Sequence, residues 1–192
     1  MTSKTFKLFL ITVSLIIGLF TIGCKKGEND PLISLRTRKA RITGGWNLSI
    51  GTYSYNSPGI YELKIDYDGD TAEEFVDGAL SNTYDYTVKF TIKKDFTYER
   101  IINEEGYGRT EKGNWFFTKK SKQLGLKNKE AIILSISSIT SSGVTTTYSG
   151  ANADEILIID RLKNDEVIFK ADKTYTSTVT DTEKYEYTYL KI

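Results

Sequence analysis

Hydrophobic and polar residues alternate along much of the chain that follows residue 44. The clearest stretch runs from 84 to 92 (YDYTVKFTI), where Tyr, Val, Phe and Ile take every second position and Asp, Thr and Lys lie between them. Successive side chains of a β-strand point to opposite faces of a sheet, so this pattern predicts a strand with one buried face. Lys93 to Asp95 predict a turn, and the segment from Phe96 to Ile102 predicts the returning strand of a hairpin.

The same alternation recurs as far as the C-terminus, where a tyrosine stands at every second position from 185 to 189. Residues 161–165 predict a hairpin loop, residues 137–149 a loop with a short edge strand, and residues 72–80 are the one segment with helical character. The remaining predicted strands are 46–55, 60–67, 113–118, 131–138, 155–160, 166–171 and 173–180. Roughly nine or ten short strands with regular turn signals predict an all-β sandwich or barrel.

Closure into an antiparallel barrel of about 8–10 strands would leave no unpaired strand edges. A transmembrane barrel is the competing interpretation. Lys, Asp and Glu occupy the positions opposite the aromatic ones, so lipid would meet charged side chains, which argues against that alternative.

The N-terminal residues have the organisation of an export signal. Met1 to Lys7 contain two lysines and no acid, and 16 uncharged, mostly apolar residues follow from Leu8 to Gly23. A membrane-spanning helix needs about 20 apolar residues, so this run is short for an anchor and typical of a secretory signal. The sequence therefore predicts a signal peptide over 1–23.

Cys24 is the only cysteine and follows Gly23 directly. The string Thr21-Ile22-Gly23-Cys24 resembles the lipobox of bacterial lipoproteins. The resemblance implies cleavage before Cys24, attachment of acyl chains such as palmitate to Cys24, and a stable membrane anchor. Residues 25–31 (KKGENDP) would then form a tether, and the expected location is the cell envelope, at the outer membrane, facing either the periplasm or the surface.

A basic stretch lies between the tether and the first strand. One interpretation is a patch for anionic lipid headgroups. The other is a lead-in segment that packs its apolar residues under the barrel and leaves its cations in solvent. In that second case the buried residues are Leu32, Ile33 and Leu35, and the solvated ones are Arg36, Arg38, Lys39 and Arg41.

The composition narrows the classes of function. The 192 residues include 26 Lys and Arg against 25 Asp and Glu, so no basic face for nucleic acid is predicted. One cysteine and no histidine remove the usual ligands of zinc and haem, and we expect neither a cofactor nor enzymatic activity. The carboxylates of Glu104, Glu105 and Glu111 are expected on a solvated surface.

One acidic segment has the spacing of a calcium loop. Asp66, Asp68, Asp70 and Asp77 take positions 1, 3, 5 and 12 of such a loop. Carboxylate oxygens suit a hard cation, although Thr71 stands where a calcium loop usually has glycine. The alternative interpretation is a solvated turn, because aspartate-rich turns between strands are common and usually bind nothing.

Three further motifs follow the lipobox in order: Gly44-Gly45-Trp46, the segment 112–116 (KGNWF) and the segment 159–168 (IDRLKNDEVI). Together they resemble the lipocalin-like lipoproteins of Gram-negative envelopes. The resemblance implies a lipocalin-like barrel over 44–192, preceded by the lipidated cysteine, tether and lead-in over 24–43. Trp46 and Trp115 would close the barrel. Lipocalins often lay an arginine of the last strand across the first tryptophan, where this chain offers only Lys184 and Lys191.

Two functions fit this description. In the first, the barrel binds a small apolar ligand in a calyx. The predicted lining residues are Tyr84, Tyr86, Phe90, Tyr98, Tyr185, Tyr187 and Tyr189. In the second, the barrel is filled by its own side chains, and the lipoprotein has a structural role or binds an envelope protein. An interior void above roughly 300 Å³ would favour the ligand.

Overall fold

We describe a computed structural model of the chain, in which residues 36–118, 130–149, 154–176 and 180–192 are described. The predicted signal peptide, Cys24 and the tether lie outside the described residues. So do Leu32, Ile33 and Leu35 of the lead-in. Among the described residues, no helix has the length and apolar character needed to cross a membrane.

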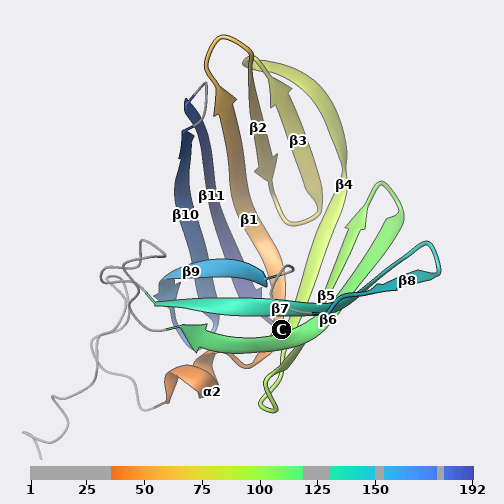
Figure 1. The fold of residues 1–192 in the computed structure, drawn as a ribbon, viewed down its shortest axis with the longest axis vertical. Helices are drawn as coiled ribbons and strands as arrows, with labels where there is room; N and C mark the ends of the chain where they lie inside the picture. Colours follow the sequence, from red (N-terminus) through yellow and green to blue (C-terminus); the bar gives the residue numbers. More distant parts are fainter. Residues whose placement is uncertain (1–35, 119–129, 150–153, 177–179) are drawn as a thin grey trace, which may run out of the picture.

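The described residues form one short helix and eleven β-strands (Figure 1). The elements are α2 (Arg38–Ile42), β1 (Gly44–Ser57), β2 (Tyr61–Tyr67), β3 (Thr71–Val76), β4 (Ala79–Ile92), β5 (Thr97–Glu104), β6 (Tyr107–Thr118), β7 (Glu130–Ser141), β8 (Val144–Thr147), β9 (Asp154–Leu162), β10 (Glu166–Thr176) and β11 (Thr180–Lys191). The segment 72–80, expected to have helical character, is instead part of the β3–β4 hairpin. Asp77 and Gly78 form its turn with φ of 51° and 79°, as a two-residue type I′ turn requires.

All the strands belong to one antiparallel sheet that closes on itself. The strand order is β6-β5-β4-β3-β2-β1-β11-β10-β9-β7-β8, and an additional pairing between β6 and β7 closes the ring. Counted through the β2–β3 hairpin the ring has ten strands, whereas at its base β1 pairs directly with β4 over Gly44 to Asn47. The predicted all-β antiparallel barrel is therefore confirmed.

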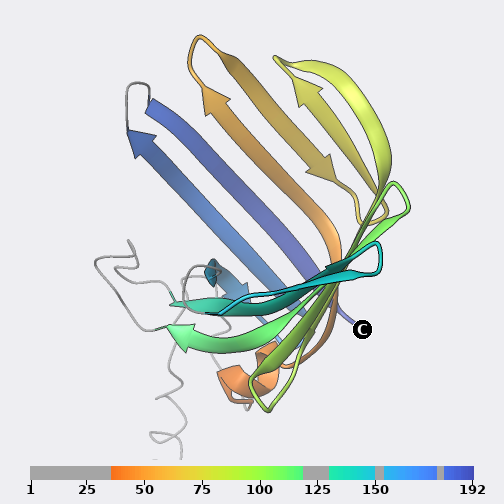
Figure 2. The same ribbon diagram turned by 45° about the vertical axis from the view of Figure 1, so that its right-hand side comes forward.

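Six strands continue beyond this ring as a curved sheet, which we call the wall (Figure 2). It consists of β2, β3 and the upper parts of β1, β4, β10 and β11. Strand β4 pairs with β5 only from Tyr86 to Ile92, and β10 pairs with β9 only from Val167 to Phe169. The wall is thus one-sided above the ring, and its inner face looks over the barrel mouth.

Aromatic and aliphatic side chains fill the ring. Its largest fully buried residues include Trp46, Phe90, Tyr98, Trp115 and Phe169. Rings pack edge-to-face across the interior, with centroids 5.8 Å apart for Phe90 and Tyr98. Such T-shaped pairs suit the quadrupole of the aromatic ring and add to the stabilisation from burial.

Helix α2 lies across the base of the ring, where it buries Ile42. The indole of Trp46 donates a hydrogen bond to the carbonyl of Ile42 at 2.8 Å, and the indole of Trp115 donates to the carbonyl of Lys93 at 2.9 Å. The ammonium of Lys191 lies 5.0 Å from the Trp46 ring centroid. Lys191 therefore takes the place in which the resemblance expects an arginine.

The expectation of a fully solvated basic lead-in is wrong for Arg41. This side chain is buried, and its guanidinium donates a hydrogen bond to the carbonyl of Leu162. Arg41 and Ile42 end α2 and are both buried against the ring. The expectation is also wrong for Arg38, whose side chain is 12% exposed and pairs with Glu130 at 2.5 Å. Arg36, by contrast, is exposed.

Candidate ligand site at the barrel mouth

Five tyrosines form a continuous layer on the inner face of the wall, which we call the tyrosine face: Tyr67, Tyr84, Tyr86, Tyr185 and Tyr187. Strand register places them together, since Gly51 on β1 lies opposite Tyr67 on one side and Tyr187 on the other. Ring centroids are 4.8 Å apart for Tyr67 and Tyr86 and 5.8 Å apart for Tyr67 and Tyr187. The layer thus crosses from β4 to β11 without a break.

Glycine at position 51 makes room for this layer. A Cβ atom there would lie 2.6 Å from a ring carbon of Tyr187, so the ring rests on the bare backbone. A glycine without positive φ in mid-strand often marks such a close approach. The sequence shows this glycine but not which ring covers it.

Burial is the main cause of a raised pKa in every member of the tyrosine face. It raises the pKa of Tyr84 to about 12, and the pKa values of the other four are also above the ordinary value. The Glu104 carboxylate contributes in the same direction for Tyr67, Tyr84 and Tyr86. All five phenols therefore stay protonated at neutral pH.

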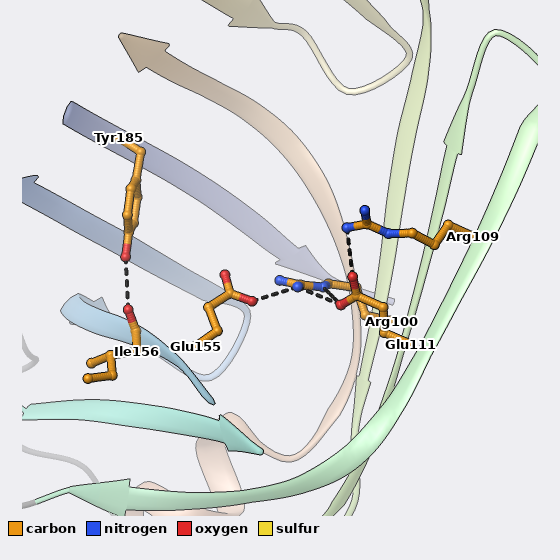
Figure 3. A network of polar contacts seen from close by, with 6 residues as sticks. All are labelled: Arg100, Arg109, Glu111, Glu155, Ile156 and Tyr185. Atoms are coloured by element: carbon orange, nitrogen blue, oxygen red, sulfur yellow. Dashed lines mark hydrogen bonds and ion pairs between the residues drawn. The ribbon is translucent and has the colours of Figure 1, made fainter. Parts of the chain in front are cut away.

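A network of charged side chains lies inside the ring below the tyrosine face (Figure 3). Arg100 contacts the carboxylates of Glu111 and Glu155, each at 2.5 Å, and Arg109 contacts Glu111 at 2.6 Å. Burial would lower the pKa of Arg100, but the charges of Glu155 and Glu111 outweigh it and raise that pKa. Two guanidinium groups thus balance two carboxylates, and the central pair, Arg100 and Glu111, is buried whereas Arg109 and Glu155 are partly exposed.

The burial of Glu111 corrects the expectation of a solvated surface for that residue, whose side chain is only 2% exposed. Register explains its position, because Glu111 pairs with Arg100 and lies on the same face of β6 as Trp115. Glu104 and Glu105, by contrast, are exposed as expected.

An open cavity of about 370 Å³ lies at the mouth, above the charged network. Strands β4, β5, β6 and β7 contribute its walls, together with the turn between β5 and β6. The lining residues are Tyr86, Ile102, Glu104, Glu105, Tyr107, Arg109 and Ser141. The turn is fixed against β4, because the amide of Glu105 donates to the carbonyl of Asp85 at 2.9 Å. We call this the mouth cavity.

The seven predicted lining residues all face inward, but they separate into two groups. Phe90, Tyr98 and Tyr189 are buried among the side chains that fill the ring. The other four belong to the tyrosine face, and of the seven only Tyr86 lines the mouth cavity. The hydroxyl of Tyr185 donates to the carbonyl of Ile156 at 3.1 Å. The sequence prediction identified the face but not the cavity, and it missed Tyr67, Tyr107 and Arg109.

The four aspartates of the predicted calcium loop do not come together. Asp68 lies in the β2–β3 turn and accepts hydrogen bonds from the amides of Asp70 and Thr71. Asp66 pairs with Lys64 at 2.5 Å, and Asp77 lies at the opposite end of β3. The described residues contain no group of three or more His, Cys, Asp or Glu side chains arranged for a metal ion. The calcium prediction is wrong because the chain reverses at residues 68–70 instead of coiling around an ion.

No protein-family model, curated protein or solved structure matches the chain.

Proposed function

We propose that this chain is a lipid-anchored lipoprotein of a bacterial cell envelope whose barrel mouth binds a small, largely apolar ligand. The observation that carries the binding proposal is the mouth cavity of about 370 Å³ beside the tyrosine face. Small-molecule pockets span roughly 300–1,000 Å³ and combine aromatic walls with a few polar groups. The ring below is filled, so the ligand would rest on its upper surface and against the wall.

Native mass spectrometry of the full chain, extracted from envelopes in a non-ionic detergent, tests the binding proposal. We expect a co-purifying small molecule that is lost in Tyr86→Ala, because Tyr86 belongs to both the cavity and the tyrosine face. The matched control is Phe116→Ala, which removes an exposed ring from the outer side of β6. A wild-type protein that carries no small molecule from its own envelope would contradict the proposal.

The anchor has its own test, since it depends on residues outside the described part of the chain. A lipidated Cys24 would incorporate radiolabelled palmitate, and two or more acyl chains make membrane attachment stable. We expect Cys24→Ser to lose the label and to leave the membrane fraction. A Cys24→Ser protein that stays in the membrane would show that something other than acylation holds it there.

The filled ring supports a second candidate, a structural or protein-binding lipoprotein. Trp46, Phe90 and Trp115 are fully buried and occupy the interior at the level of the ring. On this alternative the wall would contact an envelope protein. Cross-linking in intact cells would then capture a partner along the wall, and Tyr86→Ala would leave small-molecule content unchanged.

A further inference from the structure

The charged side chains that line the mouth cavity are mostly acidic. Its lining contains two carboxylates, Glu104 and Glu105, and one guanidinium, Arg109. Arg109 is already engaged, because its guanidinium contacts the buried carboxylate of Glu111 at 2.6 Å. The charge that the cavity offers to a ligand is therefore negative.

One of these carboxylates belongs to a residue that is flanked by a tyrosine on each neighbouring strand. On the inner face, Glu104 of β5 pairs with Tyr86 of β4 on one side and with Tyr107 of β6 on the other. Neighbouring strands lie about 4.8 Å apart, so the backbones of Tyr86 and Tyr107 are separated by about 10 Å. The next row towards the ring contains Val88, Ile102 and Arg109, which places apolar surface directly below the Tyr-Glu-Tyr row.

We propose that the ligand of the mouth cavity carries an organic cation, a quaternary ammonium or a protonated amine, on an apolar body. This inference rests on the proposed function, because it names the chemical class of the ligand that the mouth would bind. The cation would lie at the Glu104 carboxylate between the rings of Tyr86 and Tyr107, and the apolar body against Ile102 and the tyrosine face.

The physical basis is the quadrupole of the aromatic ring. Neutral tyrosine rings present negative faces that attract cations, and aromatic cages recognise quaternary ammonium groups in this way. Burial raises the pKa of Tyr86, so its ring stays neutral and its face is available for that role. The Glu104 carboxylate adds a full negative charge on the same side of the cavity.

The same arrangement disfavours an anionic ligand. An anion would meet the carboxylates of Glu104 and Glu105 at the mouth. Arg109, the guanidinium in the cavity lining, already contacts the buried carboxylate of Glu111 at 2.6 Å, so an anion would have to share it with Glu111.

Calorimetric titration of the full chain in non-ionic detergent with three matched probes tests the inference. The probes are benzyltrimethylammonium, benzyl alcohol and phenylmethanesulfonate, which share a ring and differ in charge. We expect the cation to bind at least about tenfold more tightly than either of the others, as a desolvated cation–π contact with a carboxylate allows. Glu104→Gln should reduce that preference by about tenfold, and Tyr107→Leu should reduce it as well.

Glu99→Gln is the matched control. Glu99 lies on the same strand as Glu104 but faces outward, where it pairs with Lys112 at 3.7 Å. It should therefore leave the binding of all three probes unchanged, and Glu104→Gln should retain the wild-type circular dichroism spectrum because Glu104 is exposed.

Three results would overturn the inference. If the three probes bind equally, or if Glu104→Gln and Glu99→Gln behave alike, the mouth does not select cations, although the proposed ligand site stands. If the cation fails to bind at millimolar concentration, the inference also falls. The co-purification experiment then decides separately whether the mouth binds a ligand of another class.

Discussion

The charged network inside the ring allows a quantitative test of how the interior is stabilised. Arg100→Met removes the central cation and keeps most of the volume of its side chain. The Glu111 carboxylate, with a side chain only 2% exposed, then has only Arg109 as a partner. Glu155 loses its partner too, but its side chain is 36% exposed and water can solvate it.

The expected loss of stability depends on how deeply each partner of Arg100 is buried. Leaving a buried charge without its partner costs about 3–5 kcal/mol, whereas an exposed ion pair contributes about 0–1 kcal/mol. Arg109 continues to compensate Glu111, but its side chain is 49% exposed, so we take the lower end of the range. We expect Arg100→Met to reduce the free energy of unfolding by about 3 kcal/mol, which corresponds to a Tm about 6–12 °C lower.

A second substitution separates the buried charge from lost packing. Adding Glu111→Gln to Arg100→Met removes the buried carboxylate, and the two charges that remain, Arg109 and Glu155, are exposed enough for water to solvate them. We expect the double variant to recover at least about 1.5 kcal/mol of the loss. Arg161→Met is the control, because Arg161 pairs with Glu166 at 3.2 Å in a half-exposed site, and its loss should cost less than about 1 kcal/mol.

Urea unfolding followed by tryptophan fluorescence is the assay, since both tryptophans are buried in the ring. The full chain in non-ionic detergent serves for every variant. A loss below about 1 kcal/mol in Arg100→Met, together with no recovery in the double variant, would refute the reasoning. That result would mean that water solvates the Glu111 carboxylate, contrary to its burial inside the ring.

Two further predictions concern the sheet and the tyrosine face. Gly113→Ala should destabilise the protein by about 3 kcal/mol in the same urea assay, because its Cβ would lie 2.0 Å from the carbonyl oxygen of Ser135. Gly108→Ala should be tolerated, because its Cβ would lie 3.4 Å from Oδ1 of Asn103, an ordinary contact distance. Equal stabilities of the two variants would contradict the geometry. Alkaline unfolding should begin near pH 10. The pKa values of the tyrosine face are raised in the folded state, so the contribution of these tyrosines to stability is complete below about pH 10. That contribution is lost as the pH rises through the pKa values of the folded protein. Absorbance at 295 nm should then report tyrosinate formation together with loss of the β-sheet spectrum, and tyrosines that titrate near pH 10 in a protein that stays folded would count against it.

The alternation of side chains was sufficient to predict most of the strands and their inner faces, but not β3. The pattern from 84 to 92 correctly assigned Val88 and Phe90 to the interior, because one strand needs only its own sequence to show its two faces. The same parity would have placed Arg100 and Glu111 inside, since they alternate with Tyr98 and Trp115. They were not predicted there because charged side chains are far more often solvated than buried.

The contacts between strands were not predictable in the same way. Arg100 and Glu155 are 55 residues apart, and their meeting depends on the registers of β5, β6, β7 and β9. The residues of the turns contain part of the information that determines which strands pair. Asp77-Gly78 and Glu105-Gly106 both adopt positive φ at two successive residues, and Asp-Gly is a strong hairpin signal. Recognition of Asp77-Gly78 as a hairpin turn would have prevented the helical interpretation of 72–80.

The pairing of β1 with β11 has a consequence for how a newly made copy is completed. The amide of Ile192 donates to the carbonyl of Gly45 at 3.0 Å, so the residue that follows β11 is bound to the start of β1. During synthesis β1 stays without this neighbour until β11 has been made, and contacts between such distant residues form slowly. A copy truncated before β11 would present β1 and β10 as two open edges at once, which invites association with other chains. The pairing of β11 with β1 and β10 covers both edges.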